Sequence, residues 1–188
     1  MRADLNKFAM PEKIVGQMVV LVPRNHQYDA KIWELIDGSR AFLRPYLFWV
    51  DDTKSVADVS KISEMFFAAF TESKYFEYVF LDKQSGRLVG AGGAHTIDYE
   101  RRVAELGYYR DVESGGHGYV SEAVALLSQE LFAKGIHRLV IRCDVENLAS
   151  AEVAKRSGFV CEGIAKDGIY GYGEYHDEYV FARINKEE

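Results

Sequence analysis

The chain has 188 residues, of which 48% are hydrophobic and 13% aromatic, so it can bury a sizeable core and global disorder is excluded. This length suggests a single domain. The net charge is −6 and no block of lysine or arginine stands out, which argues against a general nucleic-acid-binding protein.

The N-terminal stretch MRADLNKFAMPEK lacks the apolar segment of a signal peptide, and no stretch approaches the ~20 apolar residues of a membrane helix. We therefore expect a cytoplasmic protein with no membrane segment. The two cysteines, Cys143 and Cys161, lie within apolar runs and have no partner at metal-ligand spacing, so we expect buried free thiols. The histidines also show no metal-ligand spacing, and we expect no metal.

The first half of the chain predicts a strand, two helices and then antiparallel strands. MVVLVP (18–23) is typical of a short strand ended by proline, and apolar residues at helical steps predict helices over 29–36 and 55–72. Ser55 is the expected cap of the second helix. Between these helices, the aromatic segment 41–50 contains Pro45 and is expected to be irregular or a broken helix. Three strands are then expected, at 75–82, 87–98 and 102–111, the first two joined by the turn KQSG.

The second half alternates helices and strands. An apolar-periodic helix runs through Lys134 and should stop at Gly135, since a left-handed residue favours glycine there. A strand is expected at 137–146, then a short helix at 147–159 between the cap Asn147 and Gly158. The segments 160–169 and 174–184 predict a closing β-hairpin. The whole order indicates an α+β fold.

The stretch VESGGHGYVSEA (112–123) packs three glycines between a strand and a helix. Free backbone N–H groups and the positive end of a helix meet there, which favours an anion site. A tight strand-to-helix turn without a ligand is the alternative. The stretch lacks the Gly-Lys-Ser/Thr ending of a P-loop, and Ser121 occupies the third-glycine place of a dinucleotide fingerprint. A second glycine-rich run, GAGGA (90–94), is interpreted as a strand that needs close backbone approach.

Three separated blocks carry a resemblance to a known family. They are LRPYLFWVDDTKSVADV, AELGYYRDVESGGHGYVSEAVALL and RLVIRCDVENLASAEVAKRSGFVCEG. In this order they resemble the GCN5-related N-acetyltransferases (GNAT), and within them the RimJ/RimL-type protein N-terminal acetyltransferases. The resemblance covers nearly the whole chain and implies one N-acetyltransferase domain over 1–188. It also implies a mixed, mostly antiparallel central sheet flanked by helices, in which a splayed strand pair forms the acyl-coenzyme A cleft.

The resemblance implies acetyl-coenzyme A as the cosubstrate, with its pyrophosphate on the loop amides. The pantetheine arm would lie between 106–110 and 143–147, with its thiol toward Ser150. The implied cofactor-binding residues are Leu106, Gly107, Tyr108, Gly115, Gly116, His117, Gly118, Tyr119, Val120, Ser121 and Asn147. His117 is expected to be an exposed spacer that contributes only its backbone N–H.

Acetyl transfer to an amine needs a proton acceptor, an oxyanion donor and a proton for the leaving thiolate. Glu105 is the implied base, directly or through water, and Ser150 the implied partner of the leaving sulfur. Each has an ordinary alternative, a solvated strand glutamate and a serine satisfying local backbone. Trp49 and Asp51, with Asp52, are candidates for binding the amine, since aromatic rings and carboxylates suit a cation.

The chain departs from the family pattern at three places. Gly115 replaces the usual arginine or glutamine, Val120 the last glycine or alanine, and Ala154 the tyrosine that serves many relatives as general acid. The expected function is N-acetylation of a primary amine by direct attack on the thioester, with a protein N-terminal α-amine, such as that of a ribosomal protein, as the leading acceptor. A polyamine or aminoglycoside acetyltransferase, a non-catalytic acyl-coenzyme A-binding module and a homodimer stay open.

Overall fold

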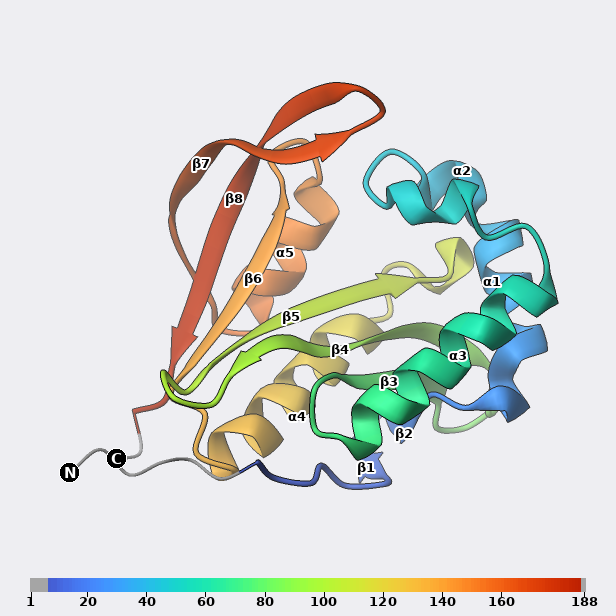
Figure 1. Cartoon of the computed structure of the whole chain (residues 1–188), viewed down its shortest axis with the longest axis horizontal. Helices are drawn as coiled ribbons and strands as arrows, with labels where there is room; N and C mark the ends of the chain where they lie inside the picture. The colour runs from blue at the N-terminus through green and yellow to red at the C-terminus, as the bar shows by residue number, and fades with distance from the viewer. Residues whose placement is uncertain (1–6, 187–188) are drawn as a thin grey trace.

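The computed structural model describes residues 7–186. One mixed sheet of eight strands forms its centre, in the order β1-β2-β3-β4-β5-β6-β8-β7. Helices cover both faces of this sheet (Figure 1). All neighbouring strands are antiparallel except β5 and β6, which run parallel. The predicted α+β fold with a mixed, mostly antiparallel sheet is confirmed.

The elements follow the predicted order. The strands are β1 (Ile14–Val15), β2 (Val19–Pro23), β3 (Phe76–Asp82), β4 (Leu88–Asp98), β5 (Val103–Arg110), β6 (Arg138–Asp144), β7 (Val160–Gly171) and β8 (Glu174–Ile184). The α-helices are α1 (Asp29–Gly38), α2 (Arg40–Leu43), α3 (Val56–Thr71), α4 (Tyr119–Ala133) and α5 (Leu148–Arg156). Short 3-10 turns occur at η1 (His26–Tyr28), η2 (Phe48–Asp51) and η3 (Val112–Ser114).

The predicted helix ends are confirmed by their capping contacts. The Ser55 side chain accepts a hydrogen bond from the backbone N–H of Asp58, and Asn147 does the same for Ser150. Gly135 and Gly158 follow α4 and α5 with φ of 91° and 82°, the left-handed geometry expected of these glycines.

Two hydrophobic clusters lie on opposite faces of the sheet. The larger one contains the inner face of α4, including Val124, Leu127 and Leu131, packed on β-strand residues such as Phe80 and Ile141. The smaller one packs residues of α1, α2 and α3 against Val79, Leu88 and Ala91 of the sheet. The sheet is therefore buried on both sides, which fixes the side-chain register along β3, β4 and β5.

The run GAGGA lies inside β4, as predicted. A Cβ atom at Gly90, Gly92 or Gly93 would overlap backbone atoms of the strands on either side. Glycine is therefore required by close backbone approach and not by a ligand.

The prediction for Cys161 is wrong. Cys143 is buried, but Cys161 is exposed. It lies on β7, which is the last strand in the sheet order and carries a mostly exposed run of residues. An apolar stretch on an edge strand resembles a buried strand in sequence.

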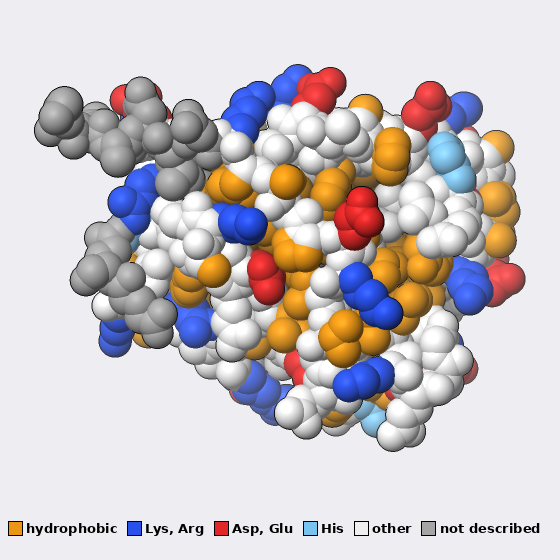
Figure 2. Space-filling view, turned by 90° about the horizontal axis from the view of Figure 1, so that it is seen from below, with side chains coloured by type: hydrophobic (Ala, Val, Ile, Leu, Met, Phe, Trp, Pro, Cys, Tyr) orange, Lys and Arg blue, Asp and Glu red, His pale blue; other side chains and the backbone are white. Residues whose placement is uncertain are grey.

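The surface seen in Figure 2 carries acidic and basic side chains interspersed among hydrophobic ones. No helix among residues 7–186 is long and apolar enough to cross a membrane.

Candidate active site

The parallel strands β5 and β6 diverge at the centre of the sheet. They pair through Val103, Ala104 and Glu105 on β5, opposite residues 138–140 on β6. Beyond Glu105, β5 continues to pair with β4 as far as Arg110, whereas β6 continues to pair with β8 as far as Asp144. The second backbone edge of residues 106–110 is therefore unpaired and borders the opening between β5 and β6. The predicted splayed pair is present (Figure 1).

The glycine loop lies beside this opening and leads into α4. Gly116 and Gly118 adopt φ of 83° and 81°, and Gly118 is the N-cap of the helix. The first backbone N–H groups of a helix have no partner within it, so this end is suited to bind an anion. Tyr119 uses its hydroxyl to bind Asp82, which leaves only its backbone for a ligand in the loop. His117 is exposed and stacks on the Tyr119 ring at 5.4 Å.

Gly115 stands where the family usually has an arginine or glutamine. In this protein the side chain of Arg110 lies beside Gly115. A Cβ atom at Gly115 would lie 3.1 Å from the Arg110 guanidinium. That guanidinium donates to the carbonyls of Asp111 and Val112, and it lies over the Phe42 ring. A cation is therefore present beside the loop, supplied from β5 instead of from the loop itself. In the sequence this arginine is the residue before the end of the strand predicted at 102–111.

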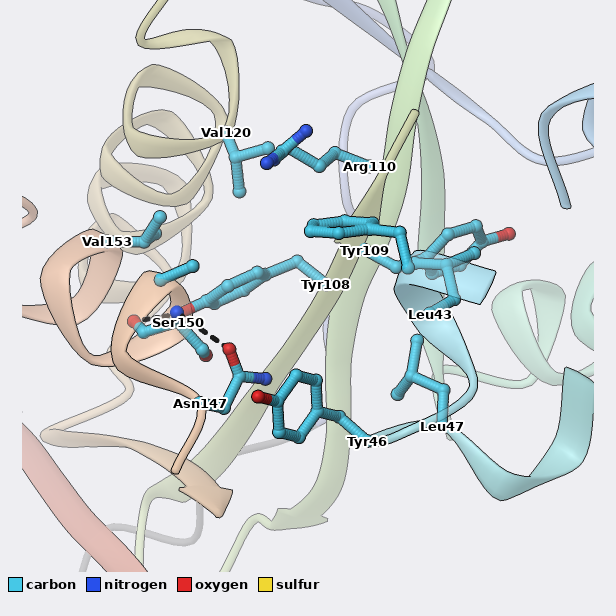
Figure 3. Close-up of a pocket in the computed structure, with 12 residues that line it drawn as sticks. Leu43, Tyr46, Leu47, Tyr108, Tyr109, Arg110, Val120, Asn147, Ser150 and Val153 are labelled. Atoms are coloured by element: carbon cyan, nitrogen blue, oxygen red, sulfur yellow. Dashed lines mark hydrogen bonds between the residues drawn. The ribbon is translucent and has the colours of Figure 1, made fainter. Parts of the chain in front are cut away.

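A cleft of about 80 Å³ lies between β5, the start of α5 and the segment around α2. Figure 3 shows Tyr108 and Arg110 from β5, Val120 from α4, Ser150 from α5 with its N-cap Asn147, and Tyr46 from the segment after α2. The Tyr46 hydroxyl donates to the Glu146 carbonyl at 3.2 Å and so spans the cleft.

Ser150 and Tyr108 form a hydroxyl pair at this cleft (Figure 3). The Ser150 hydroxyl donates to the Tyr108 oxygen at 3.1 Å, and the Tyr108 hydroxyl donates to the Ser150 carbonyl at 3.0 Å. Burial raises the pKa of Tyr108 above its usual range, with the Ser150 contact opposing the shift. A protonated phenol therefore lies beside the predicted sulfur-binding serine, although the sequence has no tyrosine at position 154.

A second cavity, of about 480 Å³, meets the cleft at Leu47, Tyr108 and Tyr109, which line both. We call it the acceptor chamber. Its walls come from the segment 47–53, from α3 and from the sheet face of β3, β4 and β5. Most of its lining is aromatic or aliphatic, as in a typical small-molecule or peptide-end pocket.

Three polar side chains mark the chamber wall formed by the sheet. Glu77 on β3 is 4% exposed, and desolvation raises its pKa to about 7 against the attraction of Arg24. Arg24 is also buried and donates to Ser63. The Tyr109 hydroxyl is buried without a hydrogen-bond partner among the described residues. A buried donor without a partner is costly, so this hydroxyl is suited to a ligand. None of these three was singled out in the sequence, because their proximity depends on strand register.

The predicted amine-binding residues separate in the structure. Trp49 and Asp52 line the acceptor chamber. Asp51 instead accepts hydrogen bonds from Arg44 and from the Tyr172 hydroxyl at the tip of the β7–β8 hairpin. Arg44 in particular holds the pKa of Asp51 below its usual range. Asp51 therefore ties the chamber rim to the hairpin.

Glu105 lies at the point where β5 and β6 separate, but it is not among the residues that line either cavity. Its carboxylate lies 3.6 Å from Arg142 and 4.0 Å from His95. Burial raises the pKa of Glu105, Arg142 lowers it, and Glu178 raises it. Among the described residues, no group of His, Cys, Asp and Glu could hold a metal ion.

The fold and this pair of cavities define an acetyltransferase of the GNAT class. Residues 19–160 match the family described as acetyltransferase (GNAT) domain, so the chain belongs to that family. It is an acyltransferase.

Individual relatives narrow the comparison. The chain is 28% identical over 154 residues to the ribosomal-protein-serine acetyltransferase of Escherichia coli (strain K12). The aligned region covers 81% of this chain and 85% of that relative. The solved structure of RimL, a ribosomal α-N-protein acetyltransferase, in complex with coenzyme A aligns with a TM-score of 0.87 at 26% identity, covering 93% and 98% of the chains. The microcin self-immunity acetyltransferase MccE, solved with acetyl-CoA and AMP, aligns with a TM-score of 0.88 at 23% identity over 93% and 97%, which supports the fold.

Proposed function

We propose that this protein transfers the acetyl group of acetyl-CoA to the N-terminal α-amine of a protein, with a ribosomal protein as the leading acceptor. One observation carries the proposal: the cleft and the acceptor chamber meet at Tyr108 and Tyr109. A thioester in the cleft would therefore face an amine entering from the chamber, as direct transfer requires. The names of the relatives, which act on ribosomal proteins, support the choice of acceptor.

The cofactor would be held along the splayed strands. The backbone amides of Gly115 to Val120 and the Arg110 guanidinium would bind the pyrophosphate. The pantetheine arm would pair with the free backbone edge at 106–110, much as an added strand does. Its sulfur would then lie near Ser150 and Tyr108, with Asn147 at the turn into α5.

The reaction would use few groups of the protein. The neutral amine attacks the thioester carbon, the C–N bond forms, and a backbone amide around Leu106–Tyr108 stabilises the oxyanion. The C–S bond then breaks and the sulfur keeps the electron pair, with Ser150 and Tyr108 as its hydrogen-bonding partners. Glu105 would assist removal of the ammonium proton through an intervening group, since its carboxylate does not line the chamber.

A small polyamine is the second candidate acceptor, and Glu77 is the observation that favours it. This carboxyl group is buried in the chamber wall, and a cationic amine would compensate its charge when it ionises. A peptide end fits the same chamber through its open rim, where Trp49 is 38% exposed.

The test is an acetyl-transfer screen with N-terminal peptides of ribosomal proteins, polyamines and aminoglycosides, monitored by release of coenzyme A thiol and by mass of the product. We expect acetylated peptide α-amines. If only polyamines were acetylated, the acceptor would be a polyamine and not a protein N-terminus. Binding of acetyl-CoA with no transfer to any amine would identify a non-catalytic acyl-CoA-binding module.

A further inference from the structure

His95 occupies the chamber wall next to the point where the cleft opens. It lies on β4 directly opposite Glu105 on β5, and its side chain lines the acceptor chamber. The His95 Nε2 atom lies 4.0 Å from a Glu105 carboxylate oxygen. His95 is therefore the side chain that stands between the chamber and the predicted base.

The backbone at this point has an unusual geometry. The pairing of β4 with β5 shifts register between His95 and Asp98, and Thr96 adopts a φ of 50°. A β-branched residue rarely takes this left-handed conformation, and such irregularities re-aim side chains next to active sites. The Thr96 hydroxyl lies 2.9 Å from His95 Nδ1. In the tautomer whose Nδ1–H donates to the Thr96 hydroxyl, the Nε2 atom carries a free lone pair.

Gly107 leaves space beside that lone pair. A Cβ atom at position 107 would lie 3.2 Å from His95 Nε2. The backbone φ of Gly107 is not positive, so the ring contact, and not the backbone conformation, accounts for the glycine. Gly107 belongs to the part of β5 that has no pairing with β6, and it also lines the chamber. The space beside Nε2 therefore lies where the chamber meets β5, the strand along which the cofactor would bind.

Burial keeps the His95 ring neutral, and the charges nearby stabilise it once it has accepted a proton. Burial lowers the pKa of His95, so the free enzyme presents neutral imidazole at neutral pH. Beyond it, Arg142 lies between two carboxylates, 3.6 Å from Glu105 and 2.7 Å from Glu178. This group holds one cation and two anions, and an imidazolium at position 95 would balance it.

We propose that His95 Nε2 takes the proton from the acceptor's ammonium group, and that Glu105 is a positioning residue that stabilises the resulting imidazolium. This role rests on the proposed acetyl transfer. The amine left behind attacks the thioester carbon, the C–N bond forms and the C–S bond breaks. The amine nitrogen loses another proton when the amide forms, and this proton goes to the sulfur. His95 then releases its own proton to solvent.

Four titratable or charged side chains surround the imidazole and will shape its titration. Tyr75 stacks on it at 5.5 Å from the start of β3, and Glu105 faces it from β5. Arg142 on β6 contacts Glu105, and Glu178 on β8 contacts Arg142, so both act on the imidazole at second hand.

The test compares His95→Gln, His95→Ala and Glu105→Gln in the full chain, with the best amine from the acceptor screen. We expect His95→Gln to lower turnover about a hundredfold or more, the usual contribution of general base catalysis, and to remove the acidic limb of the pH profile. Coenzyme A affinity should not change. Added imidazole should restore part of the activity of His95→Ala. Glu105→Gln should keep the limb but move it to lower pH, because the imidazolium loses its carboxylate.

A titration of the His95 ring by NMR in the unmodified protein gives a readout that needs no variant, and its midpoint should match the kinetic limb. His26→Gln, at an exposed histidine beside Asp29, is the matched control and should keep the wild-type profile. Full turnover in His95→Gln, or a ring midpoint away from the limb, would overturn the role of His95. An unmodified protein that binds coenzyme A but acetylates no amine would instead refute the proposed function itself.

Discussion

Under the proposed function, residues of β5 would supply two side chains that the family usually places in its motifs. Arg110 lies beside Gly115, and the Tyr108 hydroxyl lies beside Ser150, although position 154 holds alanine. In both cases the replacement comes from the strand that borders the cleft. A residue at a different position in the sequence can therefore take over a chemical role, provided that its side chain reaches the same point in the site.

The Tyr108 hydroxyl gives the first prediction at the residue scale. Tyr108→Phe should lower turnover by about a hundredfold, because the leaving thiolate loses the nearest protonated phenol. Ser150→Ala should have a similar effect, and the double variant should lose little more, since the two hydroxyls act as one pair. The measurement is kcat with acetyl-CoA saturating. Tyr99→Phe is the matched control, since that partly buried hydroxyl donates to the Ser73 carbonyl away from the cleft. Additive effects of the two variants would contradict the pairing.

Glu77 gives a prediction about stability. Its pKa is about 7 in the folded protein and 4.5 in its ordinary state. Between these values the folded protein holds a proton that the unfolded chain has released, so the stabilising contribution is complete below pH 4.5 and is lost as pH rises through 7. At 1.36 kcal/mol per pKa unit, the loss is about 3 kcal/mol.

Glu77→Gln should therefore be more stable than the unmodified protein above pH 7, and the difference should shrink toward pH 4.5. Urea unfolding at several pH values measures this difference. Glu64→Gln, at an exposed position of α3, should show no such trend. A constant difference across this pH range would show that Glu77 titrates normally.

The element that carries cofactor binding is the loop leading into α4. Gly118→Val should abolish coenzyme A binding, because valine resists the left-handed φ of 81° and so disturbs the amides at the helix start. Calorimetric titration with coenzyme A measures the loss. The matched control is Gly158→Val, which meets the same strain at φ 82° after α5. It should destabilise the fold and keep the affinity. Unchanged affinity in a folded Gly118→Val protein would remove the loop from the binding site.

Elements with local signals were predictable from the sequence, and contacts across strands were not. Ser55 and Asn147 cap helices through bonds to residues three positions on, so their roles follow from spacing alone. The two-residue strand β1 was missed because so short an element shows no periodicity, whereas the broken helix expected at 41–50 is present as α2 and the turns after it. His95 and Glu105 were both visible in the sequence, but they meet only through the pairing of β4 with β5. The same holds for Tyr108 and Ser150, which lie 42 residues apart.

At the scale of the whole molecule, the sheet consists of two halves with a weak junction. Strands β1 to β5 form one half, and β6, β8 and β7 form the other. Among residues 7–186, direct strand pairing joins them only from Val103 to Glu105. Beyond this point the halves are linked by side chains, such as the Tyr108–Ser150 pair and the bond from Tyr46 to the Glu146 carbonyl. A ligand that lies in the opening contacts both halves and should act as an additional strand between them.

Coenzyme A should therefore stabilise the molecule as a whole and not only its loop. At a hundred times its Kd it should add about 2.7 kcal/mol to the free energy of unfolding, which raises Tm by roughly 5–10 °C for a chain of this size. Hydrogen exchange should slow at residues 106–110 on one half and at 143–147 on the other. Inorganic pyrophosphate is the control ligand, because it can occupy the loop but cannot reach across the opening, and it should protect only residues 115–120. If coenzyme A also protects the loop alone, the pantetheine arm does not lie between the strands and the direct-transfer geometry fails.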